Sequence, residues 1–128
     1  YKRQEMKTMN KEQAHELAYR IAEILDSKKG MDIVIIDISA KSVLADYFVI
    51  ASGRSTTAVK SLCDNVEEKL SEEGIEPARR DGMNESKWIV MDYGSVILHV
   101  FHAETREYYR LERLWADEAN CEYYGEGK

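Results

Sequence analysis

Two stretches of the chain carry apolar residues at the three- and four-residue spacing of an amphipathic helix. The first begins after Asn10, which can form a capping box with Gln13, and it is expected to end at Gly30 in left-handed geometry. The second begins after the N-cap Ser55 and ends just before Gly74. The apolar faces are Ala14, Leu17, Ala18, Ile21, Ala22 and Leu25 in the first helix, and Val59, Leu62, Cys63, Val66 and Leu70 in the second.

Three stretches outside these helices have the composition of single strands. Residues 32–38 contain consecutive apolar residues, which is typical of a strand buried on both faces. Residues 46–52 form the next strand and lead directly into the second helix. Residues 75–80 predict a short edge strand, because Pro77 cannot donate to a sheet ladder.

The C-terminal third begins with two apolar strands, residues 88–91 and 96–101, that are joined by D-Y-G-S. Gly94 can supply the positive φ of a tight turn, so an antiparallel hairpin is expected. A final helical segment rich in aromatic and charged residues follows the hairpin and ends near Trp115.

This order of elements predicts an α/β single domain with a mixed sheet of about five strands flanked by helices. A length of 128 residues suits one domain. We expect residues 9–118 to form the domain, residues 1–8 to be a tag remnant or an N-terminal extension, and residues 119–128 to be a polar C-terminal tail.

The charge balance limits the class of partner. The chain has 24 acidic and 18 basic residues, a net charge of −6, and its basic runs are only pairs. Direct DNA binding is not expected, because it usually needs clustered Lys and Arg. A basic protein surface is the better electrostatic match. No apolar run approaches the ~20 residues of a membrane helix, and two cysteines without a disulfide framework favour a cytoplasmic location.

Metal binding is not expected from the two histidines near the end of the hairpin. His99 and His102 are three residues apart on a strand, so they point to opposite faces of the sheet. Neither has a Cys or carboxylate partner at ligand spacing. No cofactor is indicated.

The hairpin also offers a surface for recognition. Trp88, Val90 and Asp92 share one face of their strand, and Met91 and Tyr93 point to the other. A face that combines a large aromatic residue with a charge is typical of an exposed binding surface. The final segment adds further aromatic and apolar residues: Tyr108, Tyr109, Leu111, Leu114 and Trp115.

Four motifs resemble those of the Iojap family, the ribosomal silencing factors. They are W-I-V-M-D-Y-G-S-V-I-L-H-V-F-H at 88–102, R-E-Y-Y-R-L-E-R-L-W at 106–115, A-D-Y-F-V-I-A-S-G at 45–53, and D-I-V-I-I-D-I at 32–38. They occur in the family's order, and the resemblance as a whole covers about residues 10–117.

The resemblance implies a protein without catalytic activity that binds the large ribosomal subunit through its protein fourteen and blocks the joining of the small subunit. It also implies that the protein can form a homodimer. Organelle relatives act in large-subunit assembly, and this alternative stays open. Carried onto the matching positions, the residues expected to bind the partner are Trp88, Met91, Asp92, Tyr93, His99, Tyr109, Glu112 and Arg113.

The family fold resembles a nucleotidyltransferase without its active site. A nucleotide-binding enzyme of that type is therefore the remaining alternative to a ribosome-binding protein. Residues 52–55, S-G-R-S, imitate the Gly-Ser entry of that class into a helix. Metal-dependent phosphoryl transfer needs paired carboxylates on a following strand. The hairpin supplies only Asp92, and the acidic cluster at 64–67 lies in a predicted helix. We therefore do not expect an enzyme.

Overall fold

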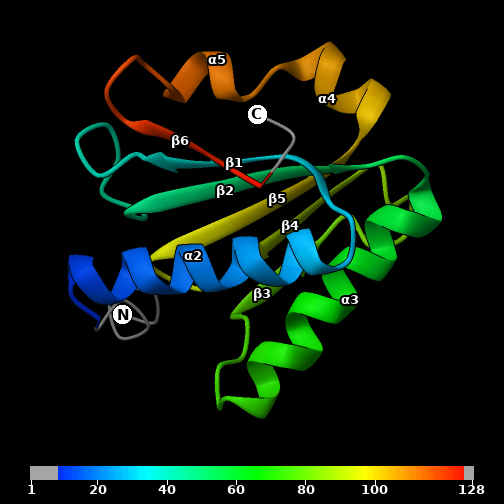
Figure 1. Ribbon diagram of the computed structural model, residues 1–128, viewed down its shortest axis with the longest axis horizontal. Coiled ribbons are helices and arrows are strands. Elements are labelled where there is room, and N and C mark those ends of the chain that lie inside the picture. The colour runs from blue at the N-terminus through cyan, green and yellow to red at the C-terminus, as the bar shows by residue number, and fades with distance from the viewer. Residues whose placement is uncertain (1–8, 126–128) are drawn as a thin grey trace.

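The computed structural model describes residues 9–125. The expected tag remnant or extension at residues 1–8, and residues 126–128 of the expected tail, lie outside the described residues. The described chain forms one domain on a mixed six-stranded sheet, with α2 and α3 on one face and α4 and α5 on the other (Figure 1). The predicted α/β single domain is confirmed, with six strands where about five were expected.

The strand order across the sheet is β3-β4-β5-β2-β1-β6. Only β2 and β5 run parallel, and the other neighbours are antiparallel. A parallel pair needs a long crossover, which here contains α3 and the β3–β4 hairpin. The elements are α2 Lys11–Ser27, β1 Met31–Asp37, β2 Tyr47–Gly53, α3 Thr56–Glu72, β3 Arg79–Asp81, β4 Trp88–Asp92, β5 Val96–His102, α4 Ala103–Tyr109, α5 Glu112–Trp115 and β6 Cys121–Tyr124.

Both long helices begin at the predicted caps. Asn10 Oδ1 accepts the Gln13 backbone N–H at 2.8 Å, and Gln13 Oε1 accepts the Asn10 N–H at 3.0 Å, which completes the capping box. Ser55 Oγ accepts the Ala58 N–H at 3.0 Å at the start of α3. These bonds satisfy backbone donors that have no partner within the helix.

The predicted left-handed end of α2 at Gly30 was wrong. Helix α2 ends at Ser27, and the left-handed residue is Lys29, with φ of 68°. Gly30 avoids crowding instead: a Cβ there would lie 3.0 Å from the Leu25 carbonyl oxygen. At the end of α3 the prediction was correct, since Gly74 has φ of 82°.

Strand β1 lies inside the sheet between β2 and β6, and residues 33–36 are buried without interruption. Its neighbour β6 was missed by the sequence analysis, which placed residues 121–124 in the polar tail. This strand pairs antiparallel with β1, from Ile36 opposite Cys121 to Ile33 opposite Tyr124. The other edge is β3, three exposed residues within and just beyond the stretch predicted as an edge strand.

Two apolar clusters lie on opposite faces of the sheet. The larger cluster is formed by α2, α3 and the sheet residues that point toward them. The smaller cluster is covered from α5 and contains Val34, Ile36, Ile38, Ala45, Phe48, Ile50 and Phe101, with Trp88, Ile97, Leu111 and Trp115 packed at its margin. No helix within residues 9–125 is long and apolar enough to cross a membrane.

Candidate docking surface around Trp88

The predicted hairpin of β4 and β5 is confirmed and positions the candidate site. Trp88 pairs with Phe101 and Val90 with His99 in the antiparallel register. Gly94 has φ of 86°, and its N–H donates to Asp92 Oδ1 at 2.8 Å. The carboxylate of Asp92 is buried and helps to shape the turn, so its visible role is structural.

The two faces of β4 differ sharply in exposure. Trp88 and Val90 are partly exposed on the face away from α2 and α3. Met91 is fully buried and Tyr93 is 4% exposed, both in the larger cluster. Burial also raises the pKa of the Tyr93 hydroxyl above its usual range. Met91 and Tyr93 were expected to bind the partner, but their burial removes them from the surface of this structure.

The indole of Trp88 is held by aromatic and polar contacts from three directions. Its ring centroid lies 4.7 Å from that of Phe101 in a stacked arrangement and 5.1 Å from that of Tyr109. Its Nε1–H donates to His99 Nδ1 at 3.1 Å. Since Trp88 is also partly exposed, it is a large side chain with a fixed orientation at the surface.

His99 lies beneath this surface and does not form part of it. It is buried between Trp88 and Phe48, whose ring centroid lies 4.5 Å away in an edge-to-face arrangement. Burial lowers the pKa of His99 to about 4, so the imidazole is neutral at pH 7. Because Nδ1 accepts from Trp88, the ring proton is on Nε2, which has no hydrogen-bond partner within residues 9–125.

The three predicted residues after the hairpin have different environments. Tyr109 is 53% exposed and contacts Trp88, so it extends the same surface. Glu112 accepts from Arg106 Nε at 3.0 Å, which connects α5 to α4. Arg113 is exposed, and its guanidinium makes no ion pair within residues 9–125.

A cleft of about 790 Å³ lies beside Trp88, between the β3–β4 loop and α4. Its aromatic wall was expected from the sequence, but its polar wall from the β3–β4 loop was not, because a polar loop gives no periodic signal. Tyr108, 82% exposed, and Tyr109 form one side, with ring centroids 5.1 Å apart. The lining residues are Arg80, Asp81, Gly82, Met83, Asn84, Glu85, Lys87, Trp88, Glu104, Thr105, Tyr108 and Tyr109.

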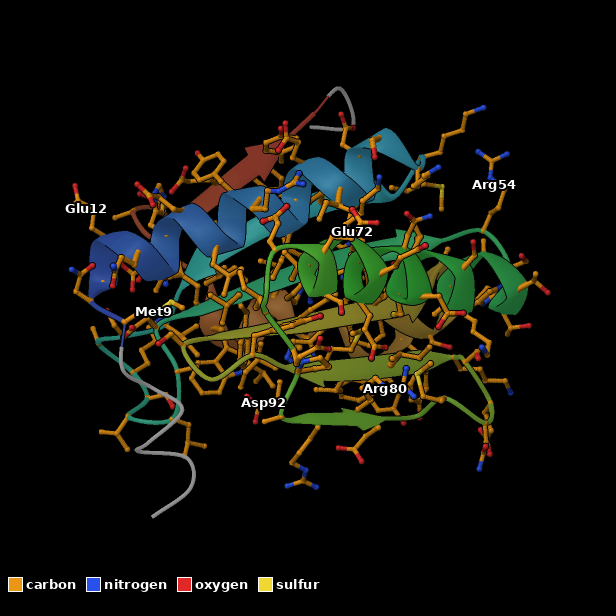
Figure 2. All side chains as sticks on the ribbon, turned by 90° about the horizontal axis from the view of Figure 1, so that it is seen from below. Met9, Glu12, Arg54, Glu72, Arg80 and Asp92 are labelled. Atoms are coloured by element: carbon orange, nitrogen blue, oxygen red, sulfur yellow. The ribbon has the colours of Figure 1, made fainter. Side chains whose placement is uncertain are left out.

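The turn from β2 into α3, which imitates a nucleotidyltransferase motif, is accounted for by packing. A Cβ on Gly53 would lie 3.0 Å from the Val59 backbone nitrogen, so glycine allows the helix to start close to the strand. Ser55 caps the helix. In Figure 2, which looks onto α2 and α3, the side chain of Arg54 extends outward from this turn. No group of three His, Cys, Asp or Glu residues within residues 9–125 could hold a metal ion.

The fold and this site define an α/β domain with an exposed aromatic surface around Trp88. The comparisons with known proteins give its family. A model of the family described as "ribosomal silencing factor during starvation" matches residues 11–126. The chain therefore belongs to the ribosomal silencing factor family, which confirms the resemblance and the expectation of a non-enzymatic protein.

Individual relatives agree with this assignment. The chain is 38% identical over 92 residues to the ribosomal silencing factor of Bacillus subtilis, covering 72% of this chain and 78% of that protein. A crystal structure of a protein from Chromobacterium violaceum is 30% identical with a TM-score of 0.76, covering 93% of this chain and 96% of that one. A mouse protein named for mitochondrial assembly of the ribosomal large subunit is 30% identical over 98 residues, 74% of this chain and 43% of that protein.

Proposed function

We propose that this protein binds the large ribosomal subunit through its protein fourteen and thereby prevents the small subunit from joining. The observation that carries the proposal is Trp88, a partly exposed indole held by Phe101, Tyr109 and His99 in a member of the silencing-factor family. Large aromatic residues with fixed orientation are typical centres of protein interfaces. We propose a cytoplasmic location, in keeping with bacterial relatives such as that of Bacillus subtilis.

The proposed contact surface is narrower than the set expected from the sequence. Trp88 and Tyr109 touch the partner directly, and Arg113 adds an exposed charge. The remaining residues support these from below or within the domain: Asp92 through the β4–β5 turn, His99 through the indole, and Glu112 through Arg106. Met91 and Tyr93 contribute only to the core.

The inhibition needs no chemistry. A domain of this length has a radius of gyration of about 14 Å. When it is bound at the face of the large subunit that meets the small subunit, it fills volume that the small subunit must occupy. The fraction of large subunits that carry the protein then sets the degree of inhibition.

Electrostatic attraction contributes to the encounter. The chain has a net charge of −6, and a basic surface on the partner protein would attract it. Salt screens such attraction, with a Debye length of about 8 Å at physiological ionic strength. We therefore expect affinity to fall when NaCl is raised from about 50 to about 500 mM, because the Debye length becomes shorter as the salt concentration rises. An affinity that is independent of salt would refute this electrostatic contribution.

The test is co-sedimentation with separated ribosomal subunits, comparing the wild type with Trp88→Ala. Tyr123→Ala is the matched control, because Tyr123 is an exposed aromatic residue on β6, at the far side of the sheet from β4. We expect the wild type and the control to bind the large subunit alone and to exclude the small subunit, and Trp88→Ala to lose binding. Absence of wild-type binding to either subunit would refute the proposal.

A role in assembly of the large subunit is the second candidate, and the name of the mouse relative favours it. An assembly factor would bind the same subunit earlier, on its precursors. Depletion of the protein separates the two candidates. Accumulation of large-subunit precursors indicates assembly, whereas normal subunits with unrestrained joining during starvation indicate silencing.

We also propose that the protein forms a homodimer through the apolar hairpin, so that self-association competes with docking. Val90 and Ile97 lie partly exposed on the same side of the sheet as Trp88 and would be covered in such a dimer. Sedimentation velocity over a range of concentrations tests this. A monomer at all concentrations would refute the dimer without affecting the proposed ribosomal docking.

A further inference from the structure

The hydrogen bond from Trp88 to His99 is a polar contact inside an otherwise apolar layer. Trp88 pairs across the hairpin with Phe101, so His99, two residues earlier on β5, is its diagonal neighbour. The indole Nε1–H donates to Nδ1 at 3.1 Å. Around this bond lie the rings of Phe48, Phe101 and Tyr109.

Burial of an imidazole at this position lowers the stability of the fold. The Nε2–H of His99 has no hydrogen-bond partner within residues 9–125, and a buried donor without a partner loses its bonds to water. The edge-to-face contact with the Phe48 ring offsets this loss only weakly. An aliphatic residue would fill the same apolar space without this cost. The remaining difference is that histidine offers an acceptor to the indole.

That acceptor determines the orientation of Trp88. Stacking on Phe101 and contact with Tyr109 restrict the plane of the ring, but they leave the direction of its N–H undetermined. The bond to Nδ1 selects one direction. A side chain already fixed in its bound orientation loses less conformational entropy when a partner docks.

We propose that His99 is a positioning residue that presets the indole of Trp88 for docking and acts through Trp88 without touching the partner. This inference rests on the proposed docking of the Trp88 surface on the large subunit. It replaces the expectation from the sequence that His99 itself contacts the partner, because the imidazole is buried.

A double-mutant cycle tests whether His99 acts through Trp88. The variants are His99→Leu, Trp88→Phe, which keeps a ring but removes the N–H, and the double variant. We expect each single variant to bind the large subunit about fivefold more weakly, the effect of one neutral hydrogen bond. The double variant should bind no more weakly than Trp88→Phe alone. Additive losses would overturn the inference.

Two further variants separate positioning from general loss of packing. His99→Asn places an amide oxygen near the position of Nδ1 and should restore affinity to within about twofold of the wild type. Phe48→Leu disturbs the other side of His99 but not a ring that contacts Trp88, so it should leave affinity unchanged. Failure of His99→Asn to restore binding, or an equal loss in Phe48→Leu, would overturn the inference.

NMR of the free protein makes this failure distinguishable from failure of the proposed function. We expect a scalar coupling across the hydrogen bond between Trp88 Nε1 and His99 Nδ1, with the His99 proton on Nε2, and we expect the coupling to vanish in His99→Leu. Absence of this coupling in the wild type, or its loss in His99→Leu without weaker binding, would overturn this inference alone. Absence of wild-type binding to the large subunit would overturn the proposed function and this inference with it.

Discussion

The guanidinium Nη1 of Arg106 lies 2.9 Å from Ser52 Oγ and joins α4 to the middle of the sheet. The same nitrogen donates to the Asp32 carbonyl oxygen at 2.6 Å, and Nε donates to Glu112. One side chain, 8% exposed, therefore connects β1, β2, α4 and α5. Because Tyr109 lies on α4, this contact also supports the candidate docking surface.

Replacement of Arg106 by Met should destabilise the fold by about 3 kcal/mol, because it leaves the Glu112 carboxylate, the buried Ser52 hydroxyl and the partly buried Asp32 carbonyl without their donor. Urea unfolding followed by circular dichroism measures the change. Arg113→Met is the control: it removes the same type of side chain from an exposed position and should cost less than about 0.5 kcal/mol. Equal losses in the two variants would contradict this account of Arg106.

A pair of glycines in the left-handed region distinguishes backbone strain from steric overlap. Gly82 has φ of 88°, and a Cβ there would lie 2.1 Å from the Trp88 carbonyl oxygen. Gly74 has φ of 82° with nothing within 4 Å of the added atom. We expect Gly74→Ala to cost about 1 kcal/mol from strain and Gly82→Ala about 3 kcal/mol. Similar midpoints of thermal unfolding for the two variants would refute the difference.

His99 should make the stability of the protein depend on pH. Its pKa in the folded state is about 4, below the usual 6.5, so the unfolded chain binds the additional proton between these values. Stability therefore rises with pH through this window and falls as pH drops from 6.5 toward 4. Between pH 7 and pH 5, the wild type should lose about 2 kcal/mol more than His99→Asn.

Urea unfolding of both proteins across this range provides the measurement, and their difference removes the contribution of other titrating groups. Burial is the sole cause of the shift, and the rings around His99 carry no charge. Parallel pH profiles for the two proteins would show that His99 is not buried as described.

The two cysteines should differ in reactivity. Cys63 is fully buried on α3, and burial raises the pKa of its thiol to about 12. Cys121 on β6 is only partly buried. Since the thiolate is the reactive form, iodoacetamide at pH 8 should label Cys121 at least about tenfold faster than Cys63. Mass spectrometry of labelled peptides follows both sites, and equal rates should appear only after unfolding in urea.

Local patterns were sufficient to predict the hairpin, both helix starts and the fold class. The capping residues Asn10 and Ser55 act within their own helices, and Gly94 acts within its own turn, so neighbouring sequence contains the necessary information. Strand β6 was not predictable in this way. Its four residues, C-E-Y-Y, are too few to show a periodic pattern, and they form a strand because β1 offers a free edge far away in the sequence.

The candidate site was predictable only as far as it depends on local sequence. Alternation along β4 correctly separates Trp88 from Met91 and Tyr93, but it does not say which face the helices cover. Nor does it show whether a polar residue such as His99 lies at the surface or beneath an indole. Those facts depend on packing between elements that are distant in the chain.

The parallel pairing of β2 with β5 determines when the domain can fold during its own synthesis. The centre of the sheet cannot form until residues 96–102 have been synthesised and can pair with residues 47–53. One edge of β1 also stays unpaired until residues 121–124 have been added. Until then, the N-terminal half exposes apolar strand edges that can bind wrong partners. The sheet can therefore be completed only after residues 121–124 have left the ribosome.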